Sequence, residues 1–578
     1  MTIGKAPVNI FETYRNHILA AVEQILPGYK TDAVTLEPPR DAAHGDLSTN
    51  AAMVLAGQAK QKPRDIAEKL AEQLRSLPEV TEVTVAGPGF INLRLTYGAW
   101  QALIPAMLSA GVGYGNSTIG KGRSINVEYV SANPTGPMHI GHARGAVYGD
   151  GLATLLLKAG YKVTKEYYIN DAGTQVGMLA ESALLRYREA LGEEIGEIPA
   201  GLYPGEYLKG VGQALREQYG ESLLQKPREE QLALAKPMAI ECMMALIKHD
   251  LADLGIHHDI FTSEQKLRHE GKIEQAVARL QELGHLYRGV LEPPKGEKPD
   301  EWEAKEQLLF RSTAFGDDMD RTVQKSDGGY TYFAGDLALT LDKIARGYEV
   351  LIYMLGADHG GYVKRMEAAT LALSENRVTA DVKLCQLVHL FKNGEPMRMS
   401  KRAGNFITVR DVLDEVGRDI LRFVMLMRKT TQDMDFDLEK VKEQSKDNPV
   451  FYVQYAHARA QSVLRMAREQ MPDAWGNTAP DLSLLAHPAE LALIRLLAGW
   501  PRQVEQAALA FEPHRVIYYL QEVAASFHGL WNHADELRFI QPEQPALTAA
   551  RLALARALAV VIASGLAVCG VEPVDELR

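Results

Sequence analysis

The spacing of apolar and polar residues in the first part of the chain predicts a small α+β unit. Residues 8–26 and 63–76 have helical spacing, and residues 45–57 are predicted to form a third helix. Residues 80–95 alternate as two strands around a Gly-Pro-Gly turn. We expect this unit to end near residue 115.

The middle of the chain has the pattern of a parallel sheet. Residues 124–134 form an apolar, β-branched strand, a turn and a helical stretch follow, and residues 162–171 form the next strand. Residues 330–373 again alternate strand, helix, strand and helix, and residues 384–391 form a final strand. Strand, helix and strand at this spacing favour right-handed βαβ units. The sequence therefore predicts a multidomain α/β protein with a Rossmann-like parallel sheet.

The remaining segments are mostly helical and complete the expected domain organisation. Residues 175–310 are polar and helical, with Gly/Pro-rich interruptions, and are predicted to be an insertion in the sheet domain. After about residue 410 the pattern is that of a helical bundle. We expect four parts, namely an α+β domain, a sheet domain with its insertion, a connecting helical segment and a helical domain, at 1–115, 116–410, 411–447 and 448–578.

Composition narrows the class of protein only slightly. The 578 residues are 46% hydrophobic and 24% charged, with a formal net charge of -11, which is ordinary for a globular protein. We see no run of about 20 apolar residues and no signal-peptide pattern at the start, so we expect no membrane contact and a cytoplasmic location. The three cysteines, Cys242, Cys385 and Cys569, form no CxxC pair, so no structural metal is expected.

The first chemical cluster is His139-Ile140-Gly141-His142, at the turn from the first sheet strand into its helix. Ligands bind at the carboxyl ends of strands in open parallel sheets, and helix N-termini favour phosphate. Two imidazoles three residues apart lie on one helix face and can donate to phosphate oxygens. Gly141 would allow a nucleotide to approach the backbone closely. The alternative is an ordinary helix start.

Two further clusters also suit a nucleotide. Met399-Ser400-Lys401 lies in a basic loop after the last strand, where cations can stabilise a polyphosphate; an ordinary solvated loop is the alternative. Gly356-Ala357-Asp358-His359 follows the apolar strand VLIYML and precedes a helix. By itself it is a strand-to-helix turn with an Asp N-cap.

Acidic residues at the same sheet edge suit a guanidinium, which needs planar acceptors. Glu128 lies inside the apolar strand INVEYV, where a carboxylate needs a partner, and Asn133 follows it. Tyr332 and Asp336 flank the next predicted strand-to-helix turn. An internal salt bridge for Glu128 and helix capping for Asp336 are the alternatives.

Together these clusters resemble class I aminoacyl-tRNA synthetases. The first resembles their HIGH motif, the loop resembles KMSKS, and Gly356-Ala357-Asp358-His359 resembles the element that holds the ATP ribose. The loop departs from the family pattern, because Arg398 and Arg402 replace its first lysine and its last serine. Lys401 matches the second lysine.

The stretch VEYVSANPTGPMHIGHAR and the Tyr332–Asp336 pair resemble the arginyl branch of this class. So do AGPGFINLRL, in a domain that touches the tRNA elbow, and NPVFYVQYAHAR, at the start of the anticodon-binding helices. The resemblance implies arginine–tRNA ligation, with His139, His142 and Lys401 as catalytic residues. It implies L-arginine, ATP with Mg²⁺ and tRNA(Arg) as substrates and a monomer as the working form.

The resemblance also implies individual binding roles. Those for ATP fall on His139, Gly141, His142, Gly356, Asp358, His359, Met399, Ser400 and Lys401. Those for arginine fall on Glu128, Asn133, Tyr332 and Asp336. Aromatic and arginine residues alternate along 448–471 and could contact unpaired bases, so Tyr455 and Arg459 are predicted to bind tRNA; the alternative is that these aromatics are core residues.

Two other functions remain as alternatives. One is a different class I synthetase or an H-x-G-H nucleotidyltransferase, which the acidic residues and the helical C-terminal domain disfavour. The other is an inactive RNA-binding paralogue. Such proteins usually lose the first motif or the loop lysine, and both are present here.

Overall fold

The computed structural model describes residues 9–291, 305–397, 407–445, 447–533 and 536–577. The chain divides into two compact units. The first comprises Met1–Ile119, Lys158–Gly160 and Gln444–Arg578, and the second comprises Gly120–Leu157 and Tyr161–Glu443. Met399, Ser400 and Lys401 lie outside the described residues.

The second unit is built around a parallel five-stranded sheet of order β12-β11-β5-β6-β7. Its strands are β5 (Ser124–Glu128), β6 (Lys162–Ile169), β7 (Ile260–Ser263), β11 (Val350–Gly356) and β12 (Thr379–Cys385). The crossover helices include α6 (Ile140–Lys158), α12 (Tyr332–Ala345) and α13 (Val363–Ser374). The predicted Rossmann-like fold class is confirmed.

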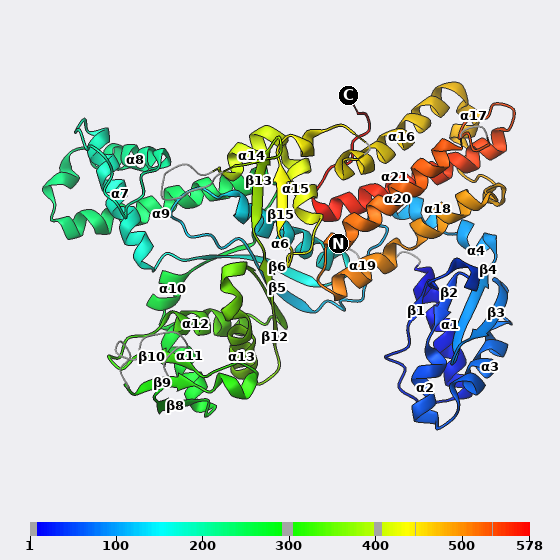
Figure 1. Ribbon diagram of the computed structural model, residues 1–578, viewed down its shortest axis with the longest axis horizontal. Coiled ribbons are helices and arrows are strands. Elements are labelled where there is room, and N and C mark those ends of the chain that lie inside the picture. The colour runs from blue at the N-terminus through cyan, green and yellow to red at the C-terminus, as the bar shows by residue number, and fades with distance from the viewer. Residues whose placement is uncertain (1–8, 292–304, 398–406, 446, 534–535, 578) are drawn as a thin grey trace. The chain divides into compact units, whose positions relative to one another are not determined.

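The segment predicted as an insertion contains part of this sheet. It begins with a helical group, α7 (Thr174–Ala190), α8 (Lys209–Tyr219) and α9 (Arg228–Asp253), which lies to one side of the sheet in Figure 1. β7 then joins the sheet beside β6. It is followed by α10 (Glu264–His269), α11 (Lys272–Glu282), and β8 (Leu286–Gly289), β9 (Gln307–Phe310) and β10 (Arg321–Gln324), which form an antiparallel sheet.

Two expected strands differ in the structure. Residues 332–345 are helix from Tyr332 onward, because Thr331 takes the N-cap position and the apolar residues of this stretch repeat with helical spacing. Residues 384–391 are divided between β12 and β13 (Val388–Lys392). β13 pairs with β14 (Glu395–Pro396) and β15 (Met434–Asp437), beside α14 (Val409–Val416) and α15 (Arg418–Leu426).

The first unit combines an antiparallel α+β domain with a helical bundle. The domain has sheet order β1-β2-β4-β3, and residues 47–49, expected to be helical, form a strand. Its elements are α1 (Ile10–Ile25), β1 (Leu36–Glu37), β2 (Leu47–Thr49), α2 (Ala51–Ala59), α3 (Pro63–Leu74), β3 (Val80–Ala86), β4 (Phe90–Leu95), α4 (Tyr97–Gln101) and α5 (Ile104–Ala110). The bundle consists of α16 (Pro449–Gln470), α17 (Pro472–Gly476), α18 (Pro488–Ala498), α19 (Trp500–Leu509), α20 (His514–Asn532) and α21 (Pro545–Cys569).

Residues 97–119 pack into this bundle. The buried Trp500 indole donates hydrogen bonds to the Tyr114 carbonyl at 2.9 Å and to Ser564 Oγ on α21 at 3.0 Å. By length and composition alone, α21 is a helix that could cross a membrane, but most of its apolar stretch is buried within the unit. Its composition is therefore accounted for by core packing.

Candidate active site

The sheet has its topological switch point between β5 and β11. From β5 the chain proceeds outward through β6 to β7, and then returns to the other side of β5 as β11 and β12. Ligands bind in the crevice that such a reversal leaves at the carboxyl ends of the strands. His139–His142 follows β5, and Gly356–His359 follows β11. The structure thus places the two predicted nucleotide elements at neighbouring strand ends.

The two histidines form a stacked pair at the N-terminus of α6. Their ring centroids are 3.8 Å apart with an interplanar angle of 20°. The His139 N–H donates to His142 Nδ1 at 3.2 Å. A Cβ at Gly141 would lie 3.0 Å from His139 Cε1, so a side chain there would displace the His139 ring.

The chain returns to this helix start just after the basic loop. His139 and Thr408 form an antiparallel bridge, and the Val409 N–H donates to the Met138 carbonyl at 2.8 Å. Lys401 lies seven residues before Thr408 in the sequence. The described residues that follow the loop are therefore adjacent to the stacked histidines.

Gly356 and Asp358 make a tight turn at the end of β11. A Cβ at Gly356 would lie 2.5 Å from Asp358 Oδ1, so a side chain there would require the Asp358 carboxylate to move. The Asp358 side chain is 82% exposed, with His359 Nε2 3.7 Å from its Oδ2. Asp358 is not the N-cap of the short 3₁₀ helix that follows, because Gly356 occupies that position.

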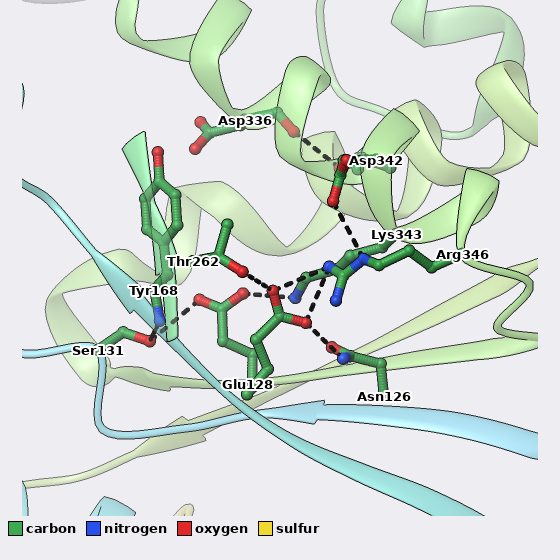
Figure 2. A network of polar contacts seen from close by, with 11 residues as sticks. Asn126, Glu128, Ser131, Tyr168, Thr262, Asp336, Asp342, Lys343 and Arg346 are labelled. Carbon is green, nitrogen blue, oxygen red and sulfur yellow. Dashed lines mark hydrogen bonds and ion pairs between the residues drawn. The ribbon is translucent and has the colours of Figure 1, made fainter. Parts of the chain in front are cut away.

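Glu128 is buried at the end of β5 and is part of an ion pair (Figure 2). The Lys343 ammonium on α12 donates to Glu128 Oε2 at 2.5 Å, and Ser131 Oγ donates to Oε1 at 3.2 Å. The internal salt bridge considered for Glu128 is therefore present. It uses one carboxylate oxygen and leaves further acceptor capacity on the other.

Asp336 has a different environment, although it lies on the same helix as Lys343. Its Oδ2 is buried and accepts no hydrogen bond from the described residues. Desolvation, reinforced by the charges of Glu128 and Glu264 and opposed by Arg365, raises the pKa of Asp336 to about 7. Asp336 does not cap α12, whose N-cap is Thr331.

Two residues near Asp336 were not predicted from the sequence, Glu264 and Tyr168. Glu264 begins α10 directly after β7, is buried, and accepts from Arg268 Nη2 at 2.6 Å. The Tyr168 phenol points toward Asp336 in Figure 2. Burial, followed by the charges of Glu264, Asp336 and Glu128, raises the pKa of Tyr168. Glu264 could have been found in the sequence from its position directly after a short strand within the predicted insertion.

The charged and titratable groups around Asp336 come from five neighbouring elements. Glu128 and Glu264 have their own cations, Lys343 and Arg268. The full set consists of Glu128, Tyr168, Glu264, Tyr362 and Arg365. Three carboxylates thus converge, and Asp336 is the one with no ion-pair contact within the described chain.

Asn133 and Tyr332 lie at the edge of this arrangement. Asn133 is exposed, and its Nδ2 donates to Gln175 Oε1 at 3.0 Å. Tyr332 is 72% exposed at the first residue of α12, four residues before Asp336. The structure brings Tyr332 and Asp336 to one helix face. It records no direct contact of either Asn133 or Tyr332 with the acidic residues.

A second candidate site lies on α16 in the helical bundle. The Arg459 guanidinium lies 4.0 Å from the Tyr455 ring centroid and 5.0 Å from that of Trp531. Arg459 Nη2 also donates to the Tyr455 hydroxyl at 2.7 Å, and Tyr455 is 41% exposed. An exposed aromatic ring with an arginine beside it can stack on an unpaired base.

Matches to protein-family models cover most of the chain. Residues 12–95 match the arginyl-tRNA synthetase N-terminal domain, and residues 103–198 match the catalytic domain of class I (R) tRNA synthetases. Residues 337–437 match class I tRNA synthetases (I, L, M and V), and residues 453–577 match the DALR anticodon-binding domain.

The parallel sheet, its switch-point crevice and these matches define a class I aminoacyl-tRNA synthetase. The chain is 57% identical to an arginine–tRNA ligase of Parvibaculum lavamentivorans and 56% identical to that of Paracoccus denitrificans. Each match covers 99% of this chain and 100% of the relative. The chain belongs to the arginyl-tRNA synthetase family.

A solved structure supports the fold independently. The arginyl-tRNA synthetase of Thermus thermophilus matches with a TM-score of 0.75 at 22% identity, covering 98% of this chain and 100% of that one. The N-terminal domain, the catalytic sheet and the helical C-terminal domain therefore share one architecture with that protein.

Proposed function

We propose that this chain, an arginine–tRNA ligase, carries out the ligation in two steps. The arginine carboxylate attacks the α-phosphorus of ATP, and pyrophosphate leaves to give arginyl-adenylate. A hydroxyl of the terminal tRNA ribose then attacks the activated carbonyl, and AMP leaves. The observation that carries the proposal is the cluster of Asp336, Glu128 and Glu264 beside the switch point, in which Asp336 has no ion-pair partner among the described residues.

The decisive experiment is ATP–pyrophosphate exchange with each amino acid, with and without tRNA. We expect exchange with arginine alone among the amino acids. Exchange with a different amino acid would point to another class I synthetase, and no exchange under any condition would point to an inactive RNA-binding relative.

The ATP site follows from the two strand ends. His139 and His142 would donate to the phosphates at the N-terminus of α6, where free N–H groups favour anions. Gly141 would leave room for the nucleotide, and Gly356, Asp358 and His359 would hold its ribose. Met399, Ser400 and Lys401 would cover the phosphates, with Lys401 stabilising the leaving pyrophosphate. Mg²⁺ would enter as part of the substrate MgATP.

The arginine site follows from the acidic pocket. Asp336 would bind the guanidinium and replace its proton with a planar pair of donors. Glu128 and Glu264 would supply further negative charge, and Asn133 and Tyr332 would orient the substrate from the edge. Positioning and electrostatic complementarity would then supply most of the rate.

Arginine affinity should therefore depend on pH through Asp336. Below about pH 7 this carboxyl is protonated, since its pKa is raised to about 7, and binding a guanidinium must expel the proton. The dissociation constant for arginine should rise about tenfold for each pH unit below that point and stay constant above it. Calorimetric titration from about pH 5.5 to about 8.5 measures this. A dissociation constant that does not change with pH would contradict the role of Asp336.

The RNA-binding role of α16 is tested by replacing Arg459 with alanine. We expect the KM for tRNA to rise about tenfold, because the guanidinium that aligns the Tyr455 ring is lost. Arg515→Ala is the matched control, since Arg515 lies in the same bundle outside residues 448–471 and pairs with Glu512. Equal KM values for the two variants, at equal Tm, would count against this interface.

The other proposals concern the remaining domains and the cell. The N-terminal domain would contact the tRNA elbow, and β4 presents Phe90 there with 41% of its surface exposed. We also infer a cytoplasmic location and a monomeric working form, as for an enzyme that serves translation.

A further inference from the structure

Two basic residues one turn apart, Lys343 in α12 and Arg346 at its C-cap, contact the sheet. Lys343 contacts Glu128 at the end of β5 (Figure 2). Arg346 contacts Glu166 on β6. Glu128 and Glu166 are register partners in the parallel pairing of these strands. The two ion pairs are therefore neighbours that join the end of α12 to adjacent strands of the sheet.

The two carboxylates differ in how completely their oxygens are used. Glu166 accepts from Arg346 through both oxygens, at 2.9 and 3.0 Å. Its Oε1 also accepts from Thr262 at 2.5 Å, and its Oε2 from Asn126 at 2.6 Å. Four hydrogen bonds saturate this carboxylate, so the Arg346–Glu166 pair is structural.

Glu128 has one carboxylate oxygen that can still accept a hydrogen bond. Lys343 occupies Oε2, and the contact to Oε1 is the Ser131 hydroxyl at 3.2 Å. That hydroxyl accepts in turn from the Tyr168 N–H at 3.1 Å. Oε1 of Glu128 is thus held by one neutral donor and remains able to accept from a ligand.

Separating the Lys343 ammonium from Glu128 would cost much free energy. Its side chain has no exposed surface, and its ammonium lies 4.4 Å from the Tyr353 ring centroid. Burial lowers the pKa of Lys343, but its electrostatic interactions with Glu128, Tyr353 and Glu166 and its hydrogen bond to Glu128 together outweigh burial, and the net pKa is raised. An unpaired ammonium in this position would be strongly destabilising, so the pair is fixed as a unit.

We propose that Lys343 is a positioning residue of the arginine pocket. It fixes the Glu128 carboxylate through Oε2 and leaves Oε1 able to accept from the substrate, and its positive charge offsets part of the negative charge that Glu128 exerts on Asp336. The inference rests on the proposed function, because it assigns Lys343 a role in arginine binding.

Removal of this cation should change how the pocket binds protons. Glu128, Asp336 and Glu264 would then share the pocket with Arg268 as the ion-pair partner of one of them. The charge of Glu128, no longer paired with an ammonium, would act more strongly on Asp336 and raise the pKa of Asp336 further. Arginine would have to expel the Asp336 proton over a wider pH range, so its binding at neutral pH would weaken.

The test compares Lys343→Met with Arg346→Met as a matched control. Arginine binding is measured by calorimetry across pH, in two buffers of different ionisation enthalpy, which also counts the protons released. We expect Lys343→Met to move the midpoint of the pH dependence upward by about one unit and to weaken arginine about tenfold at pH 7. Lys343→Arg should restore the midpoint. Arg346→Met should lower Tm without moving the midpoint.

Each outcome decides the proposal. An unmoved midpoint in folded Lys343→Met, or the same shift in Arg346→Met, overturns it and leaves Lys343 as a structural residue. If Lys343→Met does not fold, the same calorimetric pH series is run on Lys343→Gln, which also removes the cation; an unmoved midpoint in that variant overturns the proposal. Failure of the parent chain to bind or activate arginine would instead reject the proposed function.

Discussion

Lys401→Ala is expected to slow ATP–pyrophosphate exchange with arginine by about 10²- to 10³-fold in kcat. The lysine would donate to the pyrophosphate as charge develops on it, an interaction that is stronger in the transition state than in the ground state. Arginine binding should change little, because the role proposed for Lys401 concerns the leaving pyrophosphate and not the guanidinium. Exchange kinetics and calorimetric binding of arginine measure the two effects separately.

Lys392→Ala is a suitable control for this variant. Lys392 ends β13, is about half exposed, and pairs with Glu415 at 3.0 Å. Lys392→Ala removes one positive charge a few residues before the basic loop, at a lysine that pairs with Glu415. If the two variants exchange equally fast, the role of Lys401 in the transition state is wrong.

The catalytic sheet could be predicted from the sequence where the pattern is local. The apolar strand before His139, the helix after it and the strand before Gly356 each carry their own period and turn residues. Because parallel strands place their carboxyl ends at one edge, two motifs far apart in sequence could be assigned to one crevice. The structure places both motifs at neighbouring strand ends.

Short elements that depend on tertiary contacts could not be predicted in this way. β7 has four residues and was included in a polar helical region, although it pairs with β6 in the central sheet. The residues from Tyr332 onward alternate over too few positions to separate a strand from the first turn of a helix. Glu264 was missed for the same reason, since its position depends on β7.

The ion-pair partner of Glu128 could not be predicted from the sequence, for a different reason. A carboxylate in an apolar strand requires a donor, and both a substrate guanidinium and an internal ammonium meet that requirement. The internal partner, Lys343, is 215 residues away in sequence, and only the fold brings it to β5. The sequence thus identified the residue and left its internal contact undetermined.

Asp336→Asn is expected to raise the KM for arginine about 10²-fold while leaving the KM for ATP nearly unchanged. The amide replaces an acceptor by a donor and removes the charge that a guanidinium would neutralise. Glu128→Gln should also raise the KM for arginine. In that variant Lys343 loses its ion-pair partner as well. Asp342→Asn is the matched control, since Asp342 lies on the same helix and pairs with Arg346 at 3.0 Å and Lys272 at 3.3 Å.

Thermal stability separates the functional role of Asp336 from a structural one. Its folded pKa is raised from 3.8 to about 7, so the unfolded chain loses this proton first as pH rises. The stability of the folded state therefore falls between about pH 4 and 7, and above pH 7 it carries the full cost of a desolvated charge. Asp336→Asn removes that cost, so at pH 8 its Tm should equal or exceed that of the parent, whereas Asp342→Asn should lower Tm with an unchanged KM for arginine. A lowered Tm together with unchanged arginine affinity in Asp336→Asn would make this carboxylate a structural group, and the arginine pocket would have to be sought elsewhere on the sheet edge.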